Sequence, residues 1–237
     1  MNSGDDNTGT AAGVEVVNPW EERKDRGRVA ALAATLILLA TSPRRFFEAT
    51  KPEAGIWGPL FFAGLVGIIS VLLNGVVLTV LTFAFPEPVV ELLHRMEIAT
   101  DRSQLAGPED LPFGPALNLL IIVQVLLLTS PLVFVLALLA LLVYGGIVHL
   151  LLIVTRTPRP RGFRGTWVAI CYANGAGVLG IVPFAGDLAA AVCGAVLFGI
   201  GLHVVQGTGV VRAAILASIL PMLALLGLLA RFIVPSL

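Results

Sequence analysis

Long stretches without charged residues constrain this chain more than any other feature. Leu60–Phe85 contains no Asp, Glu, Lys or Arg, and Ala116–Thr155 is uncharged over an even longer distance. About 20 consecutive apolar residues cross the hydrocarbon core of a bilayer as a helix, so each stretch is long enough to span a membrane. With 57% hydrophobic and 13% charged residues, the chain also holds more apolar surface than a water-soluble fold can cover. We therefore predict an all-α, polytopic integral membrane protein.

Hydropathy and charge divide the chain into a tail and a membrane domain. Residues 1–28 are polar and lack an apolar period, so we expect a disordered cytosolic tail followed by a membrane domain over residues 29–237. Val29–Ala40 is too short to cross a bilayer and is predicted to form an N-terminal interfacial helix. Five transmembrane helices are predicted after it, at about residues 60–85, 132–155, 166–182, 187–205 and 213–234.

Arginine-rich segments determine the predicted orientation of these spans. Arg156–Arg164 contains four arginines, and short loops of this kind stay in the cytosol, as does the basic N-terminal region. Two cytosolic segments are separated by an even number of crossings, and the first span uses one of them. Residues 116–155 are therefore expected to cross once, as a helix bent at Pro131, although a re-entrant hairpin remains an alternative. The N terminus is then cytosolic and the C terminus outside.

Small residues at a spacing of four predict where the last spans pack. Gly186, Ala190 and Gly194 lie on one face of the fourth span. In lipid, no hydrophobic force draws helices together, so small residues that allow backbones to approach form the contacts. We expect a tight bundle of the last three spans along this face.

Four polar residues in the membrane domain are candidate functional groups. His149 is the strongest, because ionisable groups inside spans often serve transport or proton transfer, although a hydrogen bond to a neighbouring helix also explains it. Tyr172 and Asn174 are two residues apart and face different directions on a helix. Asp187 is expected at the start of the fourth helix, where a carboxylate caps free amides and complements the helix dipole.

No sequence pattern supports catalysis. The chain lacks the GxSxG, HExxH and phosphate-loop motifs, so we expect no catalytic, cofactor-binding or metal-binding residues and no cofactor. The formal net charge is zero, which indicates no nucleic-acid partner. The expected partners are the lipid bilayer and other membrane proteins or further copies of this chain.

Several short segments, in this order and at this spacing, resemble the Yip domain family. They are TSPRRFF at 41–47, VHLLL at 148–152, FRGTWVAICYANGAGVLGIVPFAG at 163–186, IGLHVVQGTG at 200–209 and RAAIL at 212–216. The resemblance covers Leu38–Leu229. It implies a five-span fold with a cytosolic N-terminal region, no enzyme activity and, for a prokaryotic member, a place in the cytoplasmic membrane. Eukaryotic members bind Ypt and Rab GTPases in vesicle traffic, but the polar N-terminal tail of this chain contains no recognisable GTPase-binding element. Asn174 stands where those members tend to have proline.

Two functions remain open at this point. The first is a non-catalytic membrane protein that organises the membrane or partner proteins. The second is a small permease or channel component lined by His149, Asn74, Gln124 and Tyr172. The two differ in whether these polar groups pair separately or converge on one cavity near the midplane.

Overall fold

The structure of the chain is a computed structural model that describes residues 17–51, 55–84, 131–156, 161–183 and 185–233. The regular structure of these residues is entirely helical, which confirms the predicted all-α class. The elements are α1 (Arg23–Arg26), α2 (Arg28–Thr41), α3 (Pro43–Ala49), α4 (Trp57–Ala84), α7 (Pro131–Val154), α8 (Gly162–Ala173), the 3₁₀-helix η2 (Asn174–Ile181), α9 (Ala185–Gln206) and α10 (Val210–Ile233).

Three helices of the described part are long and apolar enough to cross a membrane. They cover Trp57–Val77 in α4, Val135–Val154 in α7 and Ala185–Gln206, the whole of α9. Arg28–Thr41 and Val210–Ile219 are shorter apolar helices. An integral membrane protein follows from these lengths, whereas the full count of five spans stays a prediction.

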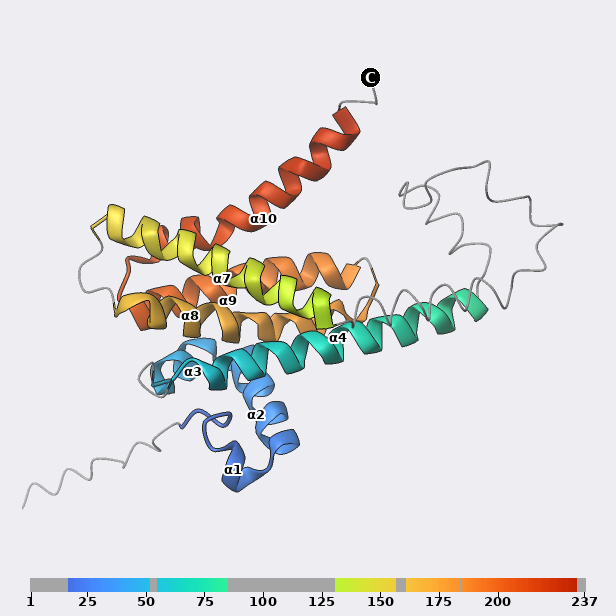
Figure 1. Cartoon of the computed structure of the whole chain (residues 1–237), viewed down its shortest axis with the longest axis horizontal. Helices are drawn as coiled ribbons and strands as arrows, with labels where there is room; N and C mark the ends of the chain where they lie inside the picture. Colours follow the sequence, from blue (N-terminus) through green and yellow to red (C-terminus); the bar gives the residue numbers. More distant parts are fainter. Residues whose placement is uncertain (1–16, 52–54, 85–130, 157–160, 184, 234–237) are drawn as a thin grey trace, which may run out of the picture.

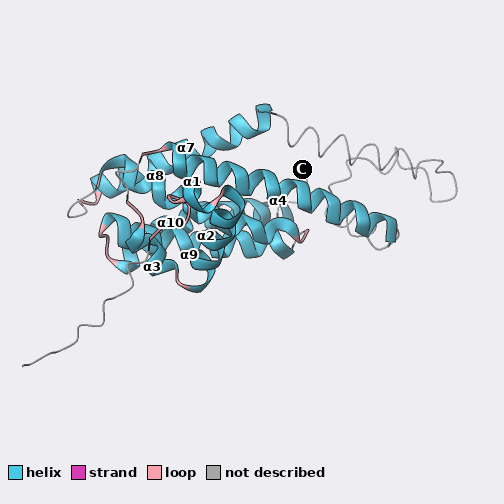
Figure 2. Cartoon of the chain, turned by 90° about the horizontal axis from the view of Figure 1, so that it is seen from below, coloured by secondary structure: helices cyan, strands magenta, loops and turns pink. Residues whose placement is uncertain are grey.

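The main helices form an elongated bundle. Figure 1 shows α4, α7, α8 and α9 running side by side, while α10 leaves the bundle at an angle and α2 runs across its axis. Viewed from below, α1 and α2 lie over the bundle (Figure 2). Helix α9 is central, because it contacts η2, α8, α10 and α3.

The segment predicted as a third span changes its helix type halfway. Helix α8 ends at Ala173 and continues directly as η2, in a stretch rich in glycine. The Asn174 side chain donates to the Ile170 carbonyl, 3.0 Å away, at this point of change. A 3₁₀-helix rises about 2.0 Å per residue against about 1.5 Å for an α-helix, so the change lengthens a segment short for a bilayer.

Close backbone approach joins η2 to α9. A methyl group on Gly186 would overlap the backbone carbonyl of Leu179, so the residue has no room for a side chain. A Cβ on Gly194 would lie 3.8 Å from the Ala173 carbonyl oxygen, which is ordinary contact, and Ala190 is half-buried. The tightest contact between the two helices is therefore at Gly186.

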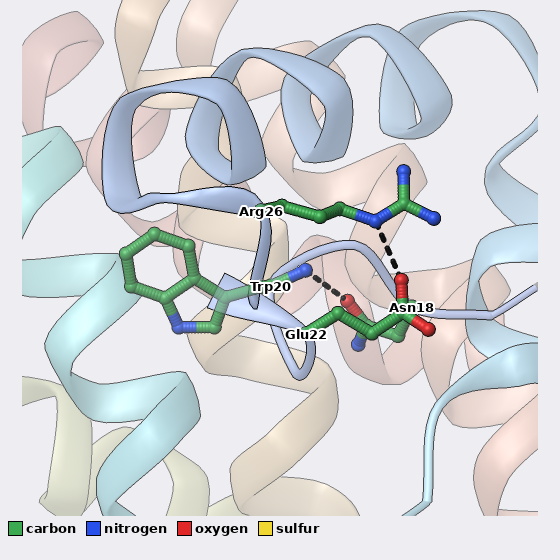
Figure 3. Close-up of polar contacts among 4 residues, drawn as sticks. All are labelled: Asn18, Trp20, Glu22 and Arg26. Atoms are coloured by element: carbon green, nitrogen blue, oxygen red, sulfur yellow. Dashed lines mark hydrogen bonds and ion pairs between the residues drawn. The ribbon is translucent and has the colours of Figure 1, made fainter. Parts of the chain in front are cut away.

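The N-terminal segment is held against the bundle. Residues 1–16 of the predicted tail lie outside the described residues, but residues 17–28 do not form a free tail. Trp20 is fully buried, and its indole N–H donates to the Gly58 carbonyl at 2.7 Å. Asn18 accepts from the Trp20 amide at 3.0 Å, as Figure 3 shows, and donates to the Thr50 hydroxyl at 3.1 Å. A tryptophan buries up to about 250 Å² of surface, enough to order this polar segment.

Most charged side chains of the described residues lie at one end of the bundle, which we call the charged end, whereas Asp187 lies at the start of α9. The charged end comprises α1 to α3, the start of α4, the end of α7, the start of α8 and the turn between α9 and α10 (Figure 1). Its basic residues are Arg23, Lys24, Arg26, Arg28, Arg44, Arg45, Lys51, Arg156, Arg161, Arg164 and Arg212, against the acidic residues Glu21, Glu22, Asp25 and Glu48. This excess of positive charge is the pattern of a cytosolic face.

Candidate functional site

A polar junction joins three helices at the charged end. The Gln206 amide donates to the Gly162 carbonyl at 2.9 Å and to the Thr166 hydroxyl at 2.8 Å, and its carbonyl accepts from the Arg161 amide at 2.7 Å. The same hydroxyl lies 3.2 Å from Nδ1 of His149 on α7. We call this set the Gln206 junction. It uses both ends of the buried Gln206 amide and fixes the end of α9 to the start of α8.

Local backbone geometry makes room for the junction. A Cβ on Gly165 would lie 2.9 Å from the Gln206 amide nitrogen, so a side chain at 165 would displace it. Helix α9 ends at Gln206, and Gly207 follows with φ +67°, a conformation that favours glycine after a helix. Thr208 then bonds back to the last turns of α9. Its hydroxyl donates to the Leu202 carbonyl at 3.0 Å, and its own carbonyl oxygen lies 2.6 Å from Nδ1 of His203.

A second polar cluster surrounds the buried N-terminal segment. The Glu21 carboxylate accepts from the Lys51 amide at 3.3 Å and from the Asn18 amide at 3.4 Å. Burial raises the pKa of Glu21, against the lowering effect of these contacts and of the positive charges of Lys51 and Arg23. The charged form of Glu21 therefore opposes docking of this segment.

Two of the predicted site residues lie in interhelical contacts. His149 pairs with Thr166 and meets the Phe163 ring edge-on, with ring centroids 5.7 Å apart. Tyr172 is fully buried between Phe46 and Phe62, with centroid distances of 4.9 and 5.2 Å. Its hydroxyl has no hydrogen-bond partner among the described residues. Tyr172 thus acts here as a large apolar group.

The other two predicted site residues are exposed. Asn174 bonds locally to Ile170, as described above. Asp187 lies within the first turn of α9, which begins earlier than expected, at Ala185. It complements the helix dipole from that position.

These polar residues do not converge on one site. Asn74 donates to the Gly180 carbonyl at 2.6 Å, and the Tyr144 hydroxyl lies 3.3 Å from the carbonyls of Leu216 and Ala217. Each pairing joins a different set of helices from the Gln206 junction. Gln124, the remaining candidate for a polar lining, lies outside the described residues.

Sequence reasoning missed the central residue of the junction. Gln206 is the one amide side chain in the segment IGLHVVQGTG, immediately before a glycine that ends the helix. That position signals a helix terminus, but the Arg161–Gly162 partner is more than forty residues away in the chain. Among the described residues, no three His, Cys, Asp or Glu side chains gather where they could hold a metal ion.

Comparison with known proteins identifies one family. Residues 36–231 match the family model of the Yip1 domain, which is most of the chain. Neither the curated proteins nor the solved structures give a match.

Proposed function

The chain belongs to the Yip1 domain family, and from that premise we propose that it is a non-catalytic integral membrane protein that organises the membrane or partner proteins within it. Five spans, a cytosolic N terminus, an external C terminus and a place in a prokaryotic cytoplasmic membrane are parts of this proposal. The excess of basic residues at the charged end supports a cytosolic N terminus, because basic segments that flank spans stay in the cytosol.

The separate pairing of the polar residues carries the proposal. His149 is engaged with Thr166, Asn74 with the Gly180 backbone and Tyr144 with the α10 backbone. A permease or channel needs polar groups that face one water-accessible path. The arrangement of the described residues instead favours groups that hold helices together.

Exposed apolar faces supply the surface for partners. Leu188, Val192 and Val196 recur every fourth residue along α9 and are all exposed. Val135, Leu139 and Val143 repeat the pattern on α7. Lipid covers these faces when the protein is alone in the membrane. The apolar face of a transmembrane helix from a partner can cover them instead.

Site-specific photocrosslinking in native membranes tests the organising role. A photoreactive residue at Val192 or Val143 is expected to give a discrete protein adduct, either with a second copy or with another membrane protein. Substitution at the buried Leu202 serves as the control, since it faces the interior of this chain. Adducts with lipid alone from every exposed position would overturn the proposal.

Cysteine accessibility tests the orientation. Single cysteines at Ser103, Thr157, Gly209 and Ser236 are placed in a chain without Cys171 and Cys193 and labelled from outside intact cells. Gly209 replaces the neighbouring Thr208 as a probe because it is exposed, whereas Thr208 is buried. Labelling at 103 and 236 alone supports five spans, and external labelling at 157 contradicts them.

A further inference from the structure

Two arginines and two aromatic rings form a stack at the start of α4. The Trp20 and Phe61 rings are nearly parallel, with centroids 5.9 Å apart and an interplanar angle of 23°. The Arg23 guanidinium carbon lies 5.4 Å from the Trp20 ring centroid, and that of Arg28 lies 6.0 Å from the Phe61 ring centroid. We call these four residues the arginine–aromatic stack. Its rings hold both guanidinium groups by cation–π attraction.

The positive charges of the stack are not neutralised by ion pairs within the described residues. Arg26 on the same short helix pairs with Glu22, as Figure 3 shows. Arg23 instead donates to the Trp20 carbonyl at 2.9 Å, and Arg28 is exposed at the first residue of α2. The Glu21 carboxylate accepts hydrogen bonds from Lys51 and Asn18 and attracts Arg23 only at longer range, without an ion pair. Two guanidinium groups without an ion pair among the described residues therefore accompany the Trp20–Phe61 ring pair, one on each ring.

The stack shares Phe61 with a stripe of exposed apolar residues on α4. Phe61 begins a row of exposed apolar side chains on α4 that continues with Ile68, Leu72 and Val76. The spacings of seven and four place them on one helix face. Because α4 is long and apolar enough to cross the membrane, acyl chains cover that face.

The depth of the stack matches the headgroup region. Trp57, the first residue of α4, is 74% exposed, and tryptophans of this kind lie at the boundary between hydrocarbon and headgroups. Val29, next to Arg28 on α2, is also a largely exposed apolar residue, at 83%. A lipid on the Phe61 stripe thus has its phosphate at the level of Arg23 and Arg28.

We propose that the arginine–aromatic stack is a binding site for an anionic phospholipid, with the phosphate on Arg23 and Arg28 and the acyl chains along the α4 stripe. Guanidinium groups bind phosphate through paired, charge-assisted hydrogen bonds. Two unneutralised cations favour a headgroup with net negative charge over a zwitterionic one. The proposal rests on membrane embedding alone, so its failure leaves the organising role untouched.

Native mass spectrometry of the purified full chain tests the site. Phosphatidylglycerol and phosphatidylcholine are titrated separately, and the dissociation constant of the first bound lipid is measured. We expect tighter binding of phosphatidylglycerol, and a loss of about fivefold in that preference for each of Arg23→Gln and Arg28→Gln. Arg26→Gln is the matched control, because it removes a neighbouring charge that Glu22 already neutralises. Equal losses in all three variants, or none at 23 and 28, would overturn the site.

Two further arms distinguish a lipid site from a site for free anions and from a general loss of positive charge. Inorganic phosphate at the lipid concentration is expected not to displace phosphatidylglycerol, and full displacement would mean a free-anion site instead. Arg23→Lys with Arg28→Lys keeps both charges and is expected to retain most of the preference. Since Arg23 packs on Trp20, the exposed Arg28→Gln variant alone decides the outcome if the Arg23 variants lower the thermal unfolding midpoint.

Discussion

The charged end and the apolar half of the bundle are held together in different ways. At the charged end, hydrogen bonds join residues far apart in sequence, such as Trp20 with Gly58 and Gln206 with Gly162. In the apolar half, η2 and α9 meet through bare backbone at Gly186. Directional bonds predominate where loops and helix ends meet, whereas between η2 and α9 close backbone approach at Gly186 fixes the fit, with single bonds such as Asn74 to Gly180 beside it.

Removing Trp20 is the strongest test of the charged end. Trp20→Ala is expected to cost about 3–5 kcal/mol, the usual range for truncating a buried tryptophan. It also leaves the Gly58 carbonyl without its indole donor. The free energy of unfolding in detergent measures the effect. Trp57→Ala is the control, since Trp57 is largely exposed, and an equally large loss there would contradict a special role for Trp20.

Filling the close contact at Gly186 tests the apolar half. Gly186→Ala places a methyl group against the Leu179 carbonyl, and we expect a cost of about 3 kcal/mol, at the upper end for overpacking. Gly67→Ala on α4 is the control, because nothing lies within 4 Å of a Cβ there. Thermal unfolding midpoints of the two variants should differ clearly. Identical midpoints would show that the η2–α9 contact yields easily, and the contrast between the two halves would then fail.

Replacing the Gln206 amide tests the hydrogen bonds of the charged end. Gln206→Leu keeps a similar size but removes the donor to the buried Thr166 hydroxyl, whereas the exposed Arg161 and Gly162 groups can bond to water instead. An unpaired buried polar group typically costs about 1–3 kcal/mol, so we expect a loss of about 2 kcal/mol. A double-mutant cycle with Thr166→Val measures the part shared with the Thr166 hydroxyl. Ser218→Ala removes only a local bond to Ala214 and should change the unfolding free energy little. Strict additivity of Gln206→Leu and Thr166→Val would contradict the junction.

A change of pH is expected to have the smallest effect on the stability of the folded chain. Because the folded state raises the pKa of Glu21 above its ordinary 4.5, protonation of Glu21 stabilises the docked segment. That stabilisation is complete below the unfolded pKa and is lost as pH rises through the folded pKa. Unfolding midpoints between pH 4.5 and 7.5 measure it. Glu21→Gln should flatten this dependence, whereas Glu48→Gln, an exposed residue paired with Arg44, should preserve it. A steeper dependence of the unfolding midpoint on pH in Glu21→Gln would contradict the stabilising effect of Glu21 protonation.

The helical class was predictable because a bilayer core offers no water to bond the backbone N–H and C=O groups. An uncharged stretch such as Leu60–Phe85 has to satisfy its backbone internally, and a helix does so. The docking of Trp20 was not predictable in the same way, since one tryptophan among polar neighbours barely alters the hydropathy of its segment. Its partners, Gly58 and Phe62, lie in another part of the chain.

The hydropathy pattern also could not predict the type of each helix or which polar side chains pair with one another. The sequence predicts one span over residues 166–182, whereas the structure changes to a 3₁₀-helix at Asn174, in a segment that contacts α4 and α9. For His149 the sequence indicates a polar group inside the membrane, and a hydrogen bond to a neighbouring helix is one of its interpretations. Which hydroxyl it meets, that of Thr166, follows only from how α7 and α8 lie together.

The tight fit between Gly165 and Gln206 has a consequence for how this chain varies. A methyl group at 165 and a full-length amide at 206 compete for the same space, so the two positions are coupled by size. An alanine at 165 shifts the flexible end of the Gln206 side chain away from its bonds to Arg161 and Gly162, and a shorter residue at 206 would remove the conflict but also those bonds. We therefore expect a substitution at one of these two positions to change which residues fit best at the other.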